Sequence, residues 1–100
     1  MLPLTNNNTS ELNETAIADT IASSMNLVVW NDEVNTFEWV IETLIEVCNH
    51  TTEQAEQCTL LIHFKGKCAV KTGDYNTLKP MCDAITERGI NATIEEVQEA

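Results

Sequence analysis

The residues best suited to bind a ligand are a polar turn, Asn31-Asp32-Glu33, and the histidine His63. The turn follows a short apolar run, and loops between buried elements often display functional polar groups. His63 falls one helical turn after Thr59, on the same face of an expected helix. Two plainer interpretations stay open. The turn could serve only as a turn and helix cap, and His63 could be a partly buried histidine with satisfied hydrogen bonds. We predict a binding site that joins the turn to His63.

Catalytic groups are scarce in this chain. It has two histidines, four cysteines and no Cys-x-x-Cys pair. The cysteines, which all fall on the apolar side of an expected element, are Cys48, Cys58, Cys68 and Cys82. We expect free thiols that pack as small hydrophobic groups, while disulfides and a small Cys/His metal site stay open as alternatives. With three glycines there is no glycine-rich phosphate loop. We therefore predict that the protein is not an enzyme and uses no metal or cofactor.

The charge balance indicates the kind of partner. Sixteen acidic against five basic residues give a net charge of −11, which argues against a nucleic-acid surface. The acidity suits a positively charged partner, or it serves only solubility. No apolar run approaches the ~20 residues of a membrane span, and the first residues do not resemble a signal peptide. We expect a cytoplasmic monomer, in which the Asn-x-Ser/Thr triplets are chance.

Hydrophobic periodicity predicts a strand and two helices in the first part of the folded chain. Residues 27–30 are a run of strand formers. Apolar side chains then recur at three- and four-residue steps over residues 37–48, which predicts an amphipathic helix. A second helix is expected to begin at Thr51, with Gln54 at capping-box spacing, and to end at Gly66.

The second part of the chain predicts a strand, a helix and a last strand. Residues 67–72 alternate between apolar and polar side chains. The third helix is expected to start no earlier than about Asn76, because Pro80 disrupts hydrogen bonding one turn back, and to end at Gly89. Residues 90–94 alternate again. The order β-α-α-β-α-β predicts an α+β fold, a three-stranded antiparallel sheet packed against three helices.

The amino-terminal residues differ in composition from the rest. Residues 1–24 are rich in Asn, Thr, Ser and Ala and contain acidic residues but no basic or aromatic ones. Such a segment buries too little apolar area to offset its ordering entropy. We expect a flexible, polar and acidic arm over residues 1–24 and one domain over residues 25–100.

These motifs together resemble the ClpS family. The family has Asn-Asp-Asp/Glu after its first strand, as at Asn31-Asp32-Glu33, and a His followed shortly by Gly-Lys on its second helix, as at His63 and Gly66-Lys67. The resemblance covers about residues 26 to 97, including the β-α-α-β-α-β order. ClpS proteins are adaptors that deliver proteins with bulky hydrophobic amino-terminal residues (N-degrons) to the ClpA or ClpC unfoldase of the Clp protease.

The resemblance implies a role for each matching residue. The substrate's α-amino group would be held by Asn31, Asp32, Glu33 and His63. The hydrophobic pocket for its first side chain would be lined by Asn35, Phe37, Val40, Thr59, Ile62 and Ile90. The chain departs from many members, which have Asp at Glu33, Thr-Pro at Asn35-Thr36 and Met at Phe37 and Thr59. The region between Gly66 and Ile90 is also shorter than in several relatives. These changes concern selectivity for the first residue more than capture of the amine.

The implied function is therefore N-degron binding and delivery to a ClpA- or ClpC-type AAA+ unfoldase, with no nucleic acid or membrane partner. The alternative is a protein–protein interaction module of the same fold without amine recognition, similar to the carboxy-terminal domain of ribosomal stalk proteins.

Overall fold

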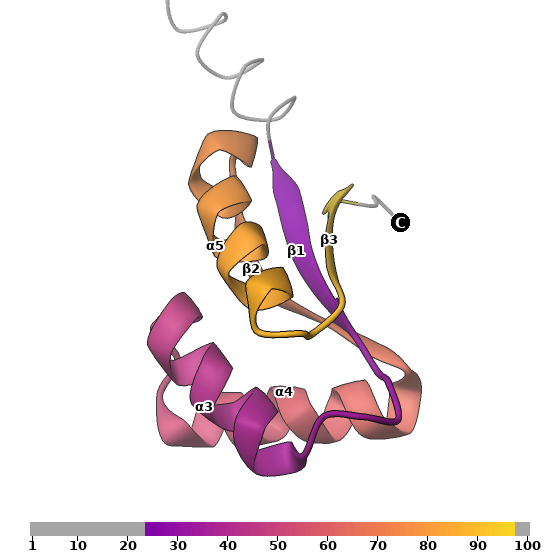
Figure 1. Ribbon diagram of the computed structural model, residues 1–100. Helices are drawn as coiled ribbons and strands as arrows, with labels where there is room; N and C mark the ends of the chain where they lie inside the picture. The colour runs from indigo at the N-terminus through magenta and orange to yellow at the C-terminus, as the bar shows by residue number, and fades with distance from the viewer. Residues whose placement is uncertain (1–23, 98–100) are drawn as a thin grey trace, which may run out of the picture.

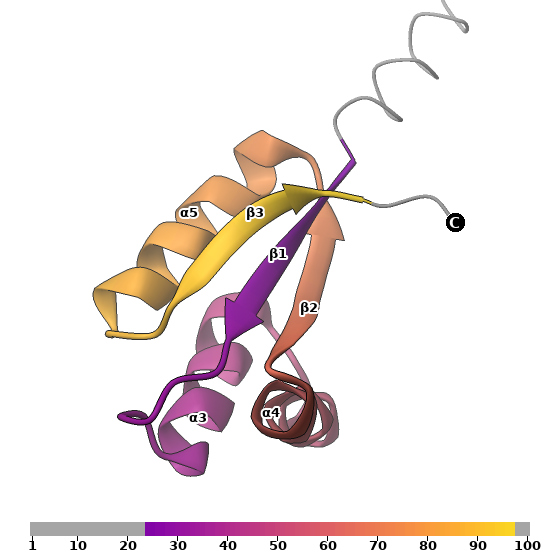
Figure 2. The same ribbon diagram turned by 90° about the vertical axis from the view of Figure 1, so that its right-hand side faces the viewer.

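The computed structural model describes residues 24–97, which form one sheet and three helices (Figures 1 and 2). The strands are β1 (Met25–Trp30), β2 (Lys67–Gly73) and β3 (Ala92–Glu96), and the helices are α3 (Phe37–Cys48), α4 (Thr52–Lys65) and α5 (Tyr75–Glu87). This order confirms the predicted β-α-α-β-α-β fold. The arm predicted over residues 1–24 lies, except for Ser24, outside the described residues. Within residues 24–97 no helix combines the length and apolar character needed to cross a membrane.

Strand β1 is the centre of the sheet. The strand order is β2-β1-β3, and both neighbours run antiparallel to β1. Leu27 pairs with Lys71 on one side and with Ile94 on the other, and a bulge in the β1–β2 pairing follows Leu27. Leu27, Val28 and Val29 are all buried, as expected for the apolar central strand. Asn31 therefore emerges from the middle of one end of the sheet.

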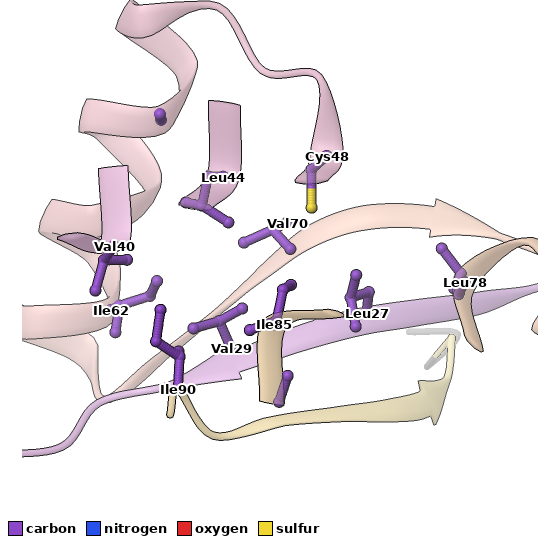
Figure 3. Packing of buried hydrophobic residues seen from close by; sticks show 12 residues of the cluster. Leu27, Val29, Val40, Leu44, Cys48, Ile62, Val70, Leu78, Ile85 and Ile90 are labelled. Carbon is purple, nitrogen blue, oxygen red and sulfur yellow. The ribbon is translucent and has the colours of Figure 1, made fainter. Parts of the chain in front are cut away.

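The core lies on one face of the sheet. Leu27 and Val29 point to the same face because side chains alternate along a strand, and they share a cluster with residues of all three helices. The other buried members of that cluster are Val40, Leu44, Cys48, Ala55, Ile62, Val70, Leu78, Ile85, Ile90 and Ala92. Figure 3 shows Val40, Ile62 and Ile90 close together at one end of the cluster. That end of the core is next to the polar turn, because the three side chains and the turn line the same cavity.

The ends of α4 match the sequence prediction. The Thr51 hydroxyl accepts the N–H of Gln54 at 3.1 Å, and the Gln54 side chain accepts the N–H of Thr51 at 2.9 Å. This capping box satisfies two backbone donors that a helix start leaves unpaired. At the other end the N–H of Gly66 donates to the carbonyl of Ile62. Gly66 itself has φ at 94°, a left-handed conformation that favours glycine.

Helix α5 starts one residue earlier than Asn76. The Asp74 carboxylate accepts the N–H of Thr77 at 2.7 Å and caps the helix, so its first residue is Tyr75. Pro80 lies inside the second turn and has no N–H to donate to the carbonyl of Asn76.

The last strand begins two residues later than Ile90. The N–H of Ile90 donates to the carbonyl of Ile85 at the end of α5, and pairing with β1 starts at Ala92. The side chains of Ile90 and Ala92 are nevertheless both in the core, as their alternation predicts.

Candidate functional site

A cavity of about 230 Å³ opens where β1 leaves the sheet. It brings together all of the candidate site residues, from three separate segments of the chain. Those residues are Asn31, Asp32, Glu33, Asn35, Phe37, Val40, Thr59, Ile62, His63 and Ile90. The cavity wall also includes Trp30 and Thr36, which the sequence analysis did not select. The roles of these residues remain predictions, but their placement around one cavity meets the first requirement for a shared site.

The inner part of the cavity is apolar. Val40, Ile62 and Ile90 are nearly fully buried members of the core cluster, and Figure 3 shows their side chains directed toward one another. Thr59 is also buried, and its hydroxyl donates to the carbonyl of Ala55 at 2.7 Å. Because that proton is already bonded within α4, Thr59 does not present an unpaired donor to the cavity.

A backbone hydrogen bond joins the polar turn to α4. The N–H of Asn31 donates to the carbonyl of Gly66 at 2.9 Å. Gly66 directly follows the last turn of α4, which carries His63. Asn31 and His63 are therefore held at the same end of the molecule although they are 32 positions apart (63 − 31).

Asp32 organises the loop that follows β1. Its Oδ1 atom accepts the N–H groups of Val34 at 2.8 Å and Asn35 at 2.9 Å, and its Oδ2 atom accepts the Asn35 side-chain amide at 2.7 Å. The backbone N–H of Asn35 is the main cause of a lowered Asp32 pKa, opposed by desolvation and assisted by the other two donors. Asp32 is therefore ionised at neutral pH. Since its folded pKa is lowered, these bonds are present at neutral pH and are lost only as the pH falls through that lowered value.

Asn35 connects the same loop to the turn before β3. Its side-chain amide also donates to the carbonyl of Gly89 at 3.0 Å. Gly89 has φ at 85° and precedes Ile90, which lines the cavity. The amide of Asn35 thus fixes the polar loop at the mouth of the cavity (Asn31, Asp32 and Glu33) relative to the apolar wall at Ile90.

The side chains of Asn31 and His63 have no hydrogen-bond partner in the described part of the chain. Within residues 24–97 neither side chain forms a hydrogen bond, in contrast to His50, whose Nε2 atom bonds the carbonyl of Val70 at 2.7 Å. The ring of Phe37 packs edge-on against His63, with centroids 5.1 Å apart. A carboxamide oxygen and a neutral imidazole nitrogen are hydrogen-bond acceptors. The mouth therefore suits a group with several N–H donors.

Trp30 was not predicted to line the cavity, because in the sequence it is the last residue of an apolar strand. Its indole N–H donates to the Thr93 hydroxyl at 2.9 Å, and the Lys67 ammonium lies 4.8 Å from its ring centroid. Both contacts involve the neighbouring strands. Only its position directly before Asn31 indicated that it borders the cavity.

Three of the four cysteines have raised pKa values. All four are free. Burial raises the pKa of Cys48 to about 11 and that of Cys68 to about 12, and it also raises the pKa of Cys82. Thiols with such pKa values stay protonated at neutral pH and are poor nucleophiles. Among residues 24–97 there is also no group of three or more His, Cys, Asp or Glu side chains arranged to hold a metal ion.

We expect Asp32→Ala to loosen the loop after β1. The substitution removes the acceptors of three loop hydrogen bonds, each worth about 1.5 kcal/mol because the acceptor is ionised. Amide hydrogen exchange at Val34 and Asn35, measured by NMR, should accelerate by about tenfold. Glu33→Ala removes a neighbouring carboxylate that makes no loop hydrogen bond in residues 24–97, and it should leave both exchange rates unchanged. Equal acceleration in the two variants would show that charge, and not the hydrogen bonds, orders the loop.

Comparison with known proteins identifies the family. The family described as "ATP-dependent Clp protease adaptor protein ClpS" matches residues 21–93. A relative, the ATP-dependent Clp protease adapter protein ClpS of Corynebacterium aurimucosum, is 29% identical over 92 residues, which cover 88% of this chain and 82% of the relative. ClpS2 of Agrobacterium tumefaciens, solved bound to L-phenylalaninamide, has a similar fold with a TM-score of 0.66 and 18% identity, over 75% of this chain and 98% of that one. The chain belongs to the ClpS family of adaptors of the ATP-dependent Clp protease.

Proposed function

We propose that this adaptor binds proteins that begin with a free, bulky hydrophobic residue and delivers them to a ClpA- or ClpC-type AAA+ unfoldase for degradation. One observation carries the proposal: a single cavity combines hydrogen-bond acceptors at its mouth with apolar side chains inside. The ligand named for the similar Agrobacterium protein, L-phenylalaninamide, has the matching chemistry, a free α-amine beside an aromatic side chain.

The mouth of the cavity matches a protein's free amino terminus. An α-amino group has a pKa of about 7.7–8.0, so at pH 7 it is mostly an ammonium with three donors and no acceptor. Asn31 and His63 supply uncommitted acceptors in this proposal. Asp32 and Glu33 supply negative charge, and Asp32 retains acceptor capacity because a carboxylate accepts about four hydrogen bonds and the loop uses three.

The inner cavity matches the side chain of the first residue. Burying a large apolar side chain contributes roughly 1.5–3 kcal/mol. Neither this contribution nor amine capture suffices alone, because association costs several kcal/mol of lost translational and rotational freedom. The proposal therefore requires both groups on the same terminal residue, which excludes internal hydrophobic residues as ligands.

A titration with peptides that differ only in their first residue tests this function. Phe- and Leu-started peptides should bind, while a Ser-started peptide of the same length should bind about tenfold or more weakly, because it forfeits the apolar contribution. Fluorescence anisotropy with labels at the carboxyl end would measure each Kd. Equal affinity for all three peptides would reject the proposed function.

We expect Phe37 to disfavour first residues that are branched at Cβ. Phe37 lies at the cavity mouth against His63, next to the proposed amine site and therefore near the first Cβ atom. A β-branched side chain is stiff at χ1 and places an extra methyl group there. An Ile-started peptide should bind about tenfold more weakly than its Leu-started counterpart, a cost of ~1.4 kcal/mol typical of overpacking.

The variant Phe37→Ala provides the control for this prediction. It should reduce the difference between Ile- and Leu-started peptides by admitting the extra methyl group. Equal Kd values for the two peptides with the unmodified protein would contradict the assignment of Phe37, without affecting the proposed capture of the amine.

The unfoldase partner is tested by delivery. We propose that the chain acts as a cytoplasmic monomer with an unfoldase of the ClpA or ClpC type. Degradation of a Phe-started fluorescent substrate should depend on the adaptor with one of these enzymes and its peptidase. Acceleration with only one of the two would identify the partner, and none with either would reject the delivery part of the proposal.

A further inference from the structure

A large apolar side chain lies exposed beside the proposed amine site. Phe64, in the last turn of α4, is 74% exposed, and Leu60, one turn earlier, is 40% exposed. Residues four positions apart share a helix face, so these two side chains form an apolar strip, here called the α4 strip. Apolar surface that is contiguous and exposed is a candidate interaction site, and this strip adjoins a cavity.

The α4 strip continues outward from the cavity. The imidazole of His63 lies between two aromatic rings, with the Phe37 centroid at 5.1 Å and the Phe64 centroid at 4.8 Å, both in edge-on geometry. Phe37 lines the cavity, whereas Phe64 does not. Phe64 is therefore on the outer side of the imidazole, next to the mouth.

In the proposed binding mode, the chain of a captured protein leaves the cavity close to this ring. Consecutive Cα atoms are about 3.8 Å apart, and the centroids of the His63 and Phe64 rings are 4.8 Å apart, so a residue one step along the chain from the amine can approach the Phe64 ring. When the α-amine is held at His63 and the first side chain enters the cavity, the second residue lies at the mouth. Its side chain can then contact Phe64, and Leu60 lies one helical turn further along α4.

We propose that the α4 strip is a binding site for the second residue of the captured protein and favours an apolar side chain there. This inference rests on the proposed function and extends it from the first residue to the second. The main support is the position of Phe64. Within residues 24–97, it is the one exposed aromatic ring that packs against His63 from outside the cavity.

Three ligands test the second-residue site. L-Phenylalaninamide has no second side chain, Phe-Gly peptides have none beyond a hydrogen, and Phe-Leu peptides have an apolar one. With the unmodified protein, the Phe-Leu peptide should bind about three- to tenfold more tightly than the Phe-Gly peptide, as expected for partial burial of one leucine. Phe64→Ala should remove that difference and leave the Kd of L-phenylalaninamide unchanged.

Tyr75→Ala is the matched control. Tyr75 is another exposed aromatic residue, 47% exposed, at the start of α5. It follows the end of β2 that pairs with Met25, whereas the cavity adjoins the Trp30 end of β1. Tyr75→Ala should therefore keep the preference for Phe-Leu over Phe-Gly.

The outcomes separate the second-residue site from the proposed function. Equal binding of Phe-Leu and Phe-Gly, together with binding of L-phenylalaninamide, would overturn the second-residue site and leave amine capture standing. A Phe64→Ala variant that binds all three ligands equally more weakly would also overturn it, because Phe64 would then only orient His63. Absence of binding by all three ligands would overturn both.

Discussion

The double substitution Asn31→Ala, His63→Ala is expected to weaken binding of a Phe-started peptide by at least about 100-fold. Both side chains line the cavity and have no hydrogen-bond partner within residues 24–97. A hydrogen bond to a charged group contributes about 1.5–3 kcal/mol. Loss of two such bonds from the ligand's ammonium therefore costs at least about 3 kcal/mol, which corresponds to about 100-fold in Kd.

The fold should survive this substitution. The structural bond that Asn31 makes uses its backbone N–H, which alanine retains. Unfolding by denaturant, followed by circular dichroism, should therefore give nearly the same midpoint for the variant and the unmodified protein. Asn91→Ala is a suitable control for loss of an exposed asparagine near the same end of the sheet, since Asn91 bonds Trp30 only through its backbone carbonyl.

The double variant also distinguishes the two classes of function. A protein–protein interaction module of this fold without amine recognition does not use the acceptors of Asn31 and His63. If the double variant binds the peptide with unchanged affinity, that alternative is favoured. If the variant loses the peptide but keeps its midpoint of unfolding, capture of the amino terminus is favoured.

The sequence predicted the elements well because their signals are local. Apolar spacing over residues 37–48 specified α3 to the residue, and Thr51 with Gln54 formed the expected capping box. The small differences arise where a polar side chain or a turn decides the boundary. Asp74 caps α5 and starts it at Tyr75, and the turn at Gly89 delays the last strand to Ala92.

The arrangement around the cavity was less accessible from the sequence. The family resemblance selected residues that line it, but not the bonds that hold them there. The Asn35 amide reaches Gly89, which is 54 positions away, and the N–H of Asn31 reaches Gly66. Such contacts depend on how strands and helices pack, which local periodicity does not encode. For the same reason, the sequence indicated Asp32 only as a residue that binds the α-amino group. It did not indicate that most of the acceptor capacity of Asp32 is used by the loop.

Acetylation of the peptide's amino terminus is the second change expected to have a large effect. It removes the positive charge, replaces three N–H donors by one and introduces a carbonyl oxygen, itself an acceptor. Each acceptor left unpaired in the site costs about 1–3 kcal/mol. With two acceptors, acetyl-Phe should bind at least about 30-fold more weakly than the free Phe-started peptide. Competition against a labelled free peptide would measure this ratio.

The acetylation penalty should depend on Asn31 and His63. In the double variant these acceptors are absent, so acetylation leaves no acceptor of Asn31 or His63 unpaired. The Kd values of the free and acetylated peptides should then differ by only a few-fold. The difference between the penalties in the two proteins is the coupling between the peptide's amine and these side chains, as in a double-mutant cycle. A penalty of the same size in both proteins would mean that the amine is recognised elsewhere, even if each protein discriminates strongly. A penalty that disappears with the side chains would assign amine recognition to the polar mouth between β1 and α4.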